Sequence, residues 1–365
     1  MMDHLPPLRP IGGDIASTTA GFDAALRRLE QAAPAEDRDQ ADIAGSVDVL
    51  RQAGLLSDDG SADPALTARR LMRVAGANLS VARLWEGHVN ARQLVTLYAD
   101  DGLRNRVERF VAQGGFLGVW GADGEVPVTL DKDGRTLRGG KIFASGLGAV
   151  SHAVVTVDSG PEVRLALVDV TDPSRADAGR WQMSGMRATR SGSYDMNGIE
   201  PVGWIGGAAD YVIEPYFHGG VWRIAALQLG GAIGLVEAAA TTLRDRGRLD
   251  AEAQKLRLTD ILIRAAAAAP LIAKAARQAT AACDQPDRAV ALSLSARLLT
   301  EAIGLDAIRA VEQGVGMGHF ADGSITGRKA RDLAVYMRQA ARDAFMMRVA
   351  DHALQSSESI WGLLE

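Results

Sequence analysis

The sequence has little of what several protein classes require. It contains one cysteine, Cys283, in 365 residues, which excludes an internal disulfide and a CxxC-type zinc or iron–sulfur site. It has no run of five like charges, and its formal net charge is -5, so no basic surface for nucleic acid is expected. These absences predict a cytoplasmic protein, without a metal centre, whose partner is a small molecule.

Long uninterrupted apolar segments are also missing. The N-terminal stretch MMDHLPPLRPIGGD carries prolines and charges where a secretory signal needs an apolar core. The longest apolar stretch, residues 221–240, contains Arg223, Gln228 and Glu237, which are costly at bilayer depth. We therefore expect no membrane partner and interpret the stretch as a helix buried in a bundle.

The pattern of the chain changes twice. Residues 21–113 are rich in Ala, Leu and Arg at helical spacing, and Asp63 before Pro64 is typical of a helix start. From Gly114 to about Gly207, short β-prone runs alternate with turns such as DKDG. The expected strands are Phe116–Trp120, Val126–Leu130, Thr136–Ala144, His152–Val157 and Val163–Val170.

Helical periodicity returns from Tyr211 onward. In the last helix Leu333, Met337, Ala340, Ala344 and Met347 step by four, three, four and three, which is typical of the seam of an antiparallel bundle. The four expected helices are Gly219–Asp245, Ala251–Cys283, Gln285–Gln313 and Arg328–His352.

The length of 365 residues exceeds one ordinary compact core and, with the pattern changes, predicts three domains. These are an N-terminal helical domain (1–113), a middle β-barrel (114–207) and a C-terminal four-helix bundle (208–365). The fold class is mainly α with a central β domain.

Five segments lie at the junctions of these blocks. They are FLGVWG (116–121), KIFASG (141–146), GMRATRSGSYDMNGIEPV (185–202), LRDRGRLDAEAQKL (243–256) and EQGVGMGHFADG (312–323). In this order, on a helix–strand–helix chain, they resemble the acyl-CoA dehydrogenase superfamily of FAD flavoproteins over residues 43–354. The resemblance implies FAD as cofactor, a homodimer or a homotetramer, and an active site where the β domain meets the bundle.

The resemblance assigns roles in the β domain. Phe143 would flank the flavin ring, and the Ser145 hydroxyl would donate a hydrogen bond to its N5/O4 edge, where negative charge develops on hydride transfer. Trp120 ends the strand that matches the one entering the family's flavin pocket and is a further cofactor-binding candidate, with a plain core aromatic as the alternative. The family's Thr-Glu-Pro and Gly-Ser-Asp segments are replaced here by GADGEVPVT (121–129).

In the bundle, Arg244 and Gln254 match an arginine and a glutamine that reach the FAD of a neighbouring subunit, with Arg246 as the alternative register. An arginine suits a pyrophosphate because its planar fork donates two charge-assisted hydrogen bonds. The alternating glycines allow close approach to the adenine-ribose part of FAD. They are Gly314, Gly316 and Gly318. Arg223 is expected near the substrate pocket.

The family's catalytic glutamate is absent from both of its usual places. The first place is four residues after the last glycine of the turn, Gly318, and is occupied by Asp322. The second is just before an arginine of the first bundle helix, Arg223, and is occupied by Trp222. Asp322 is the candidate base, as in nitroalkane oxidases, although alignment from Arg331 puts Gly323 at that position. A turn aspartate is the plain alternative.

Three histidines bear on a different chemistry. They are His319, three residues before Asp322, His88 and His352. A lone histidine on a helix is more often structural, so only His319 is taken as a secondary catalytic candidate. Reduced-flavin monooxygenases of the same fold use histidine and hydroxyl groups around the flavin in place of a glutamate.

The sequence therefore predicts an FAD-dependent oxidoreductase of acyl-CoA dehydrogenase type, in which a carboxylate removes a proton as hydride passes to flavin N5. Its substrate would be a small molecule such as an acyl-CoA. The alternatives are a flavin-dependent monooxygenase or nitroalkane-oxidase-like enzyme on the same fold, and a non-catalytic flavin-binding or structural paralogue.

Overall fold

The computed structural model describes residues 19–160, 162–281, 284–338 and 341–355. The described chain divides into two compact units. The β unit comprises residues 19–62, 84–182 and 187–211, and the helical unit comprises residues 63–83, 183–186 and 212–355. Cys283 and Ala340, which entered the expectations above, lie outside the described residues.

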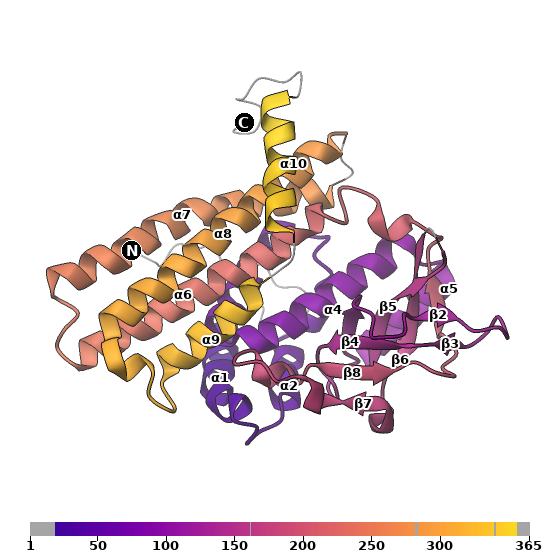
Figure 1. The fold of residues 1–365 in the computed structure, drawn as a ribbon, viewed down its shortest axis with the longest axis horizontal. Helices are drawn as coiled ribbons and strands as arrows, with labels where there is room; N and C mark the ends of the chain where they lie inside the picture. The colour runs from indigo at the N-terminus through magenta and orange to yellow at the C-terminus, as the bar shows by residue number, and fades with distance from the viewer. Residues whose placement is uncertain (1–18, 161, 282–283, 339–340, 356–365) are drawn as a thin grey trace. The chain divides into compact units, whose positions relative to one another are not determined.

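The β unit combines helices with two separate sheets (Figure 1). The larger sheet has the order β3-β2-β5-β6-β9, with β1 paired in parallel to β5, and the smaller has the order β4-β8-β7. The helices are α1 (Thr19–Asp37), α2 (Ala44–Gln52), α4 (Leu79–Tyr98, of which residues 79–83 belong to the helical unit) and α5 (Asp101–Ala112). The strands are β1 (Leu117–Trp120), β2 (Thr129–Leu130), β3 (Leu137–Arg138), β4 (Gly140–Ala144), β5 (His152–Asp158), β6 (Val163–Asp169), β7 (Ala176–Asp177), β8 (Gly192–Asp195) and β9 (Gly203–Ile205).

Three expected strands are present as β1, β5 and β6. The strand expected over Val126–Leu130 is only the two residues of β2, and the one expected over Thr136–Ala144 is two strands, β3 and β4, in different sheets. The described residues form two sheets in place of the β-barrel that we expected. The long antiparallel pair β5–β6 supplies the core, with residues 153–155 and 166–168 almost fully buried. The DKDG turn joins β2 to β3, and Asp133 accepts hydrogen bonds from the Arg135 and Thr136 amides. Asp side chains that bond the backbone two residues on are typical of such turns.

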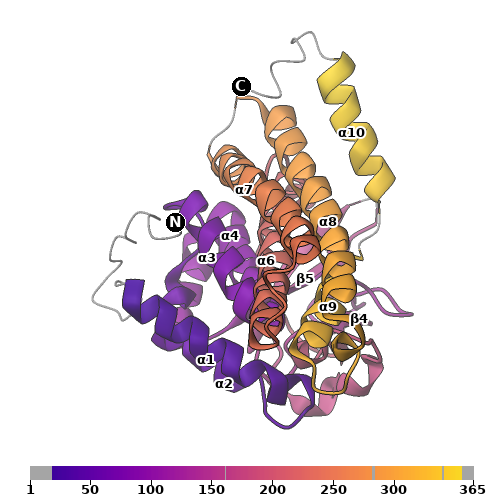
Figure 2. The same cartoon turned by 90° about the vertical axis from the view of Figure 1, so that its left-hand side faces the viewer.

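In the helical unit the long helices α6, α7 and α8 run side by side in Figure 1 and Figure 2. Helix α6 packs against α3, α7, α8 and α9. By length and composition α6 with its preceding turn (Gly219–Asp245) could cross a membrane, but 72% of its most apolar window is buried inside the protein, as in a core helix. The helices are α3 (Pro64–Ala77), α6 (Trp222–Asp245), α7 (Glu252–Thr280), α8 (Pro286–Val315), α9 (Ile325–Met337) and α10 (Arg342–Gln355).

Two expectations about the bundle are corrected. Helix α3, which the sequence placed in the N-terminal domain, packs on α6 and α7. Its start is as expected, since the Asp63 side chain accepts a hydrogen bond from the Leu66 amide. The single helix expected over Arg328–His352 is two helices, α9 and α10, and none of the α10 residues is buried. The apolar seam therefore ends at Met337.

Helices α3 and α6 cross so closely that their contact depends on glycine. A Cβ at Gly230 would lie 2.1 Å from the Met72 carbonyl oxygen, and one at Gly234 would lie 2.2 Å from the Gly76 carbonyl oxygen. Both neighbours are backbone atoms of a helix, which cannot move as a flexible side chain can. Only glycine fits at these positions.

The substitution Gly230→Ala is expected to lower the free energy of unfolding by about 2 kcal/mol, because the helices must separate to admit the methyl group. Denaturant unfolding measures the loss. Gly45→Ala in α2 is the matched control, since nothing lies within 4 Å of its added Cβ and alanine favours a helix. Equal stability of Gly230→Ala and the native protein would show that the two helices do not pack this closely.

Candidate functional site

The β unit presents an exposed aromatic ring at the end of β4. Phe143 has a φ of +52° and keeps 55% of its surface exposed. A positive φ is rare for an aromatic residue and marks a backbone held by its surroundings. The pairing of β4 with β8 shifts register between Lys141 and Ala144, and Phe143 lies in this bulge. Its ring meets Trp181 edge-on, with centroids 6.2 Å apart. The bulge thus displays a flat apolar surface.

A row of hydroxyl groups lies two residues farther on. The Ser145 and Ser191 Oγ atoms are 2.9 Å apart, and Ser191 Oγ is 2.8 Å from Thr189 Oγ1. Thr189 and Ser191 are buried, whereas Ser145 is partly exposed. A hydroxyl both donates and accepts, so Ser145 Oγ can accept from Ser191 while it donates to the Phe143 carbonyl at 3.4 Å. Sequence reasoning identified Ser145 but missed Ser191, Thr189 and Trp181.

Trp120 lies in the core beside this row. Only 3% of it is exposed, and its indole N–H donates to the Ser145 carbonyl at 3.0 Å. The ring also packs against Tyr194, with centroids 5.4 Å apart. Trp120 therefore positions the Ser145 backbone, and a direct contact of its ring with a cofactor stays a prediction.

The loop 121–128, where the family's segments are missing, is anchored by a buried lysine. The Lys141 ammonium is fully buried and donates to Asp123 at 2.6 Å and to Thr156 at 2.7 Å. Burial lowers the pKa of Lys141, and the Asp123 carboxylate opposes this shift. Asp123 also accepts a hydrogen bond from the Val128 amide at 3.0 Å. These contacts hold the loop against the sheet without the family's residues.

In the helical unit, the glycine turn follows α8. Gln254 donates to the Gly314 carbonyl at 3.2 Å, and Arg246 donates to the Val315 carbonyl at 3.4 Å. A Cβ at Gly318 would lie 2.7 Å from Arg246 Nη2. Arg246, the alternative to Arg244 as the cofactor-binding arginine, thus contacts the turn.

The remaining cofactor-binding candidates of this segment differ in their surroundings. Arg244 is exposed, and Gly316 has a φ of +69° with open space around its Cα. Gln254 is 94% buried and is engaged within its own chain. Contacts of Arg244 and Gln254 with a cofactor of a neighbouring subunit stay predictions.

The two catalytic candidates occupy different environments. Asp322 is exposed, at the end of the glycine turn. His319 is 3% exposed, and its Nδ1 lies 3.1 Å from Thr326 Oγ1. Burial lowers the pKa of His319; nearby Glu312 opposes the shift and Arg331 adds to it. A neutral imidazole is thereby favoured at this turn.

His88 has a structural role. Its Nδ1 accepts a hydrogen bond from the Leu117 amide at 3.0 Å, and its Nε2 lies 2.8 Å from the Leu56 carbonyl. These partners select the neutral tautomer with the proton on Nε2. The ring is fully buried and stacks on Phe116. Burial lowers the pKa of His88 from 6.5 to about 4, and Arg92 contributes to the same direction while the Leu56 carbonyl opposes it.

This shift gives His88 a measurable effect on stability. The unfolded chain takes up the proton below pH 6.5, whereas the folded chain resists it down to about pH 4. The free energy of unfolding should therefore fall by about 3 kcal/mol across this window because of His88 alone. Urea unfolding from pH 7 to pH 4 should show a shallower decline for His88→Gln than for the native protein. Identical pH dependence would contradict the assignment.

Arg223 and Trp222 begin α6 in the interior of the helical unit. Arg223 is 4% exposed, and its guanidinium carbon lies 5.4 Å from the centroid of the Trp222 ring. Trp222 is 1% exposed, and its indole N–H has no hydrogen-bond partner among the described residues. A tryptophan thus replaces the carboxylate expected there.

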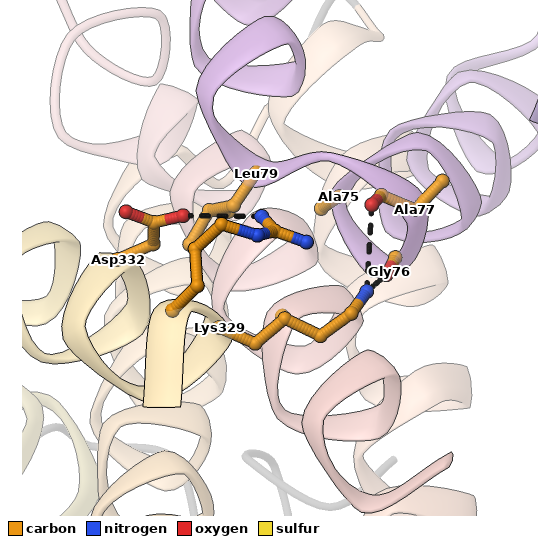
Figure 3. A pocket seen from close by; sticks show the side chains of 8 residues that line it. Ala75, Gly76, Ala77, Leu79, Lys329 and Asp332 are labelled. Atoms are coloured by element: carbon orange, nitrogen blue, oxygen red, sulfur yellow. Dashed lines mark hydrogen bonds and ion pairs between the residues drawn. The ribbon is translucent and has the colours of Figure 1, made fainter. Parts of the chain in front are cut away.

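A small cavity lies where α9 meets α3 (Figure 3). Its volume of about 10 Å³ suits a single water molecule. Lys329 donates to the Gly76 carbonyl at 2.5 Å and so caps the C-terminus of α3. Asp332, on the other side, accepts from the Met186 amide at 2.6 Å. The cavity is structural, and the described residues contain no cluster suited to a metal ion.

No protein-family model and no curated protein matches the sequence. The structure is nevertheless similar to the FMN-bound dibenzothiophene monooxygenase TdsC from Paenibacillus sp. A11-2, with a TM-score of 0.80 and 18% identity over 92% of this chain and 97% of TdsC. It is similar to the HsaA monooxygenase from M. tuberculosis, with a TM-score of 0.76 and 17% identity over 93% of this chain and 97% of HsaA. It is also similar to the nitrososynthase from Micromonospora carbonacea var. africana, with a TM-score of 0.75 and 18% identity over 96% of this chain and 99% of the nitrososynthase. The chain has the acyl-CoA dehydrogenase-like fold.

Proposed function

We propose that this protein is a flavin-dependent monooxygenase, which uses reduced flavin and O₂ to oxygenate a small molecule. The observation that carries the proposal is the exposed Phe143 ring beside the hydroxyl row of Ser145, Ser191 and Thr189. Solved structures of the same fold, including an FMN complex, are named as monooxygenases. The monooxygenase alternative is therefore preferred to the acyl-CoA dehydrogenase interpretation.

The residues at β4 suit an isoalloxazine ring. A flat heteroaromatic ring can lie against Phe143, and its carbonyl and N5 edge needs a donor such as the Ser145 hydroxyl. The resemblance implied FAD, whereas the similar TdsC structure holds FMN. We propose a flavin at this position, with FMN as the first form to test.

A bound reduced flavin supplies the electrons that activate O₂. The protein's contribution would be to orient the ring through Phe143 and to hold a proton at Ser145 Oγ. Because Ser191 and Thr189 are buried behind Ser145, they can exchange a proton along the row without admitting water. His319 remains the secondary acid–base candidate.

Two observations weigh against proton abstraction from an acyl-CoA. Trp222 occupies one of the positions where the family's glutamate is expected, and Asp322 occupies the other with an exposed carboxylate. A general base needs both reach and a tuned environment. Asp322 stays a candidate only for a carbon acid more acidic than an acyl-CoA.

A homodimer or homotetramer remains part of the proposal. Met317 is 85% exposed and Phe320 is 64% exposed, both beside the glycine turn. Large apolar side chains gathered at such a place are typical of a subunit contact.

Titration of the purified protein with FMN should quench flavin fluorescence. The substitution Ser145→Ala should weaken the affinity for FMN by about tenfold, which corresponds to the free energy of one hydrogen bond to the polar edge of the flavin ring. Ser159→Ala, at the exposed β5–β6 turn, is the matched control and should bind FMN as the native protein does. Unchanged affinity of Ser145→Ala would remove Ser145 from the site.

The two enzyme classes differ under anaerobic conditions. Acyl-CoAs should leave the colour of the bound flavin unchanged if the protein is a monooxygenase, because they then cannot donate a hydride to it. Bleaching by an acyl-CoA, followed over the visible spectrum, would restore the dehydrogenase interpretation. A protein that binds neither FMN nor FAD would favour the non-catalytic paralogue.

A further inference from the structure

Arg297, in the middle of α8, is a buried charge whose N–H groups make no hydrogen bond among the described residues. Its exposed fraction is 0%, and Nε, Nη1 and Nη2 all lack a hydrogen-bond partner among the described residues. A guanidinium carries five N–H donors and stays charged in proteins. Burying such a group is costly unless an acceptor compensates it. No acceptor of the described chain lies within hydrogen-bond distance of these N–H groups.

The groups nearest to Arg297 cover it without neutralising it. The guanidinium carbon lies 4.7 Å from the centroid of the Phe345 ring of α10, a contact that uses the flat face and leaves the N–H edges available. Glu301, one turn later, raises the pKa of Arg297 against the larger lowering by burial. Its carboxylate lies 3.6 Å from Arg342 Nε and makes no ion pair with Arg297.

Further unpartnered donors lie along the same part of α8. The Thr300 hydroxyl lies 3.1 Å from the Arg297 carbonyl and 2.8 Å from Gln228 Oε1. The Gln228 amide therefore lies beside this turn of α8, and its buried Nε2 has no described partner. Ser293, one turn before Arg297, also has a buried hydroxyl without a partner. The region thus holds several buried donors without a partner, and one buried acceptor without a partner, Glu301 Oε2.

We propose that Arg297, assisted by Gln228, binds the carboxylate of a small-molecule ligand inside the helical unit. A carboxylate presents two coplanar oxygens that match the guanidinium fork. It would also accept the amide hydrogen bond of Gln228. That this ligand is the substrate to be oxygenated rests on the proposed function; the binding itself does not.

Helix α10 is the removable cover of this site. It packs on α8 (Figure 2), and none of its residues is buried. Its polar anchors include the Arg348–Glu214 ion pair at 3.0 Å, the 2.9 Å contact of Arg348 Nη1 with His218 Nδ1 and the longer Arg342–Glu301 contact. The Phe345 ring also meets the His218 ring edge-on, with centroids 5.8 Å apart. Because no residue of α10 is buried, a ligand would reach Arg297 by displacing α10 and the Phe345 ring.

The test compares anionic probes with their neutral isosteres by thermal unfolding. The anionic probes are acetate and benzoate, and acetamide and benzamide are their neutral isosteres. At constant ionic strength set with NaCl, each anion should raise the midpoint temperature of unfolding of the native protein by about 2 °C or more, and the neutral compounds should not raise it. Arg297→Met should abolish the response, whereas Arg297→Lys should keep part of it. Arg309→Met, at an exposed position of the same helix, should respond as the native protein does.

Without probes, Arg297→Met should be at least as stable as the native protein, because it removes an uncompensated buried charge. The proposal is overturned if neither anion stabilises the native protein, if Arg297→Met responds equally, or if Arg297→Met alone unfolds at a clearly lower temperature, as a purely structural arginine predicts. Flavin binding is a separate measurement. If the protein binds no flavin but is still stabilised by acetate and benzoate through Arg297, Arg297 binds a ligand that serves another activity.

Discussion

The bulge in β4 is the constraint on which the proposed site depends. Lys141 points into the core, where Asp123 and Thr156 hold its ammonium, and the register shift before Ala144 turns Phe143 out at a positive φ. Strand β8 is held close as well, since a Cβ at Gly192 would lie 2.2 Å from the Asp177 carbonyl oxygen. A strained, exposed aromatic ring beside a serine is thus fixed by buried charge and close backbone packing.

The sequence predicts the long elements well because their signals are local. Helices α6, α7 and α8 follow 3.6-residue periodicity, β5 is rich in β-branched residues, and β6 is mostly apolar. Tertiary contacts decide the rest. The place of α3 depends on glycines more than 150 residues away in α6. Helix α9 ends at Met337, although the apolar spacing of the sequence continues beyond it.

In the candidate site, too, local motifs reveal some residues and tertiary contacts reveal the others. Phe143 and Ser145 are found because they lie together in one motif, whereas Ser191, 46 residues later, joins them only through folding. Arg297 carries no sequence signal, since one arginine in a helix is ordinarily exposed. Its burial is visible only when α8 is seen within the helical unit. Motifs thus locate the groups that a family shares, and the structure locates those particular to this chain.

The most direct measurement is the release of hydrogen peroxide when reduced FMN meets O₂ in the presence of the protein. Free reduced flavin reacts with O₂ and releases peroxide at once, whereas an oxygenase must shield its flavin to direct oxygen to a substrate. The account predicts that stoichiometric protein slows peroxide release several-fold and that Phe143→Ala restores the fast rate. Release at the rate of free flavin with the native protein would contradict a flavin monooxygenase.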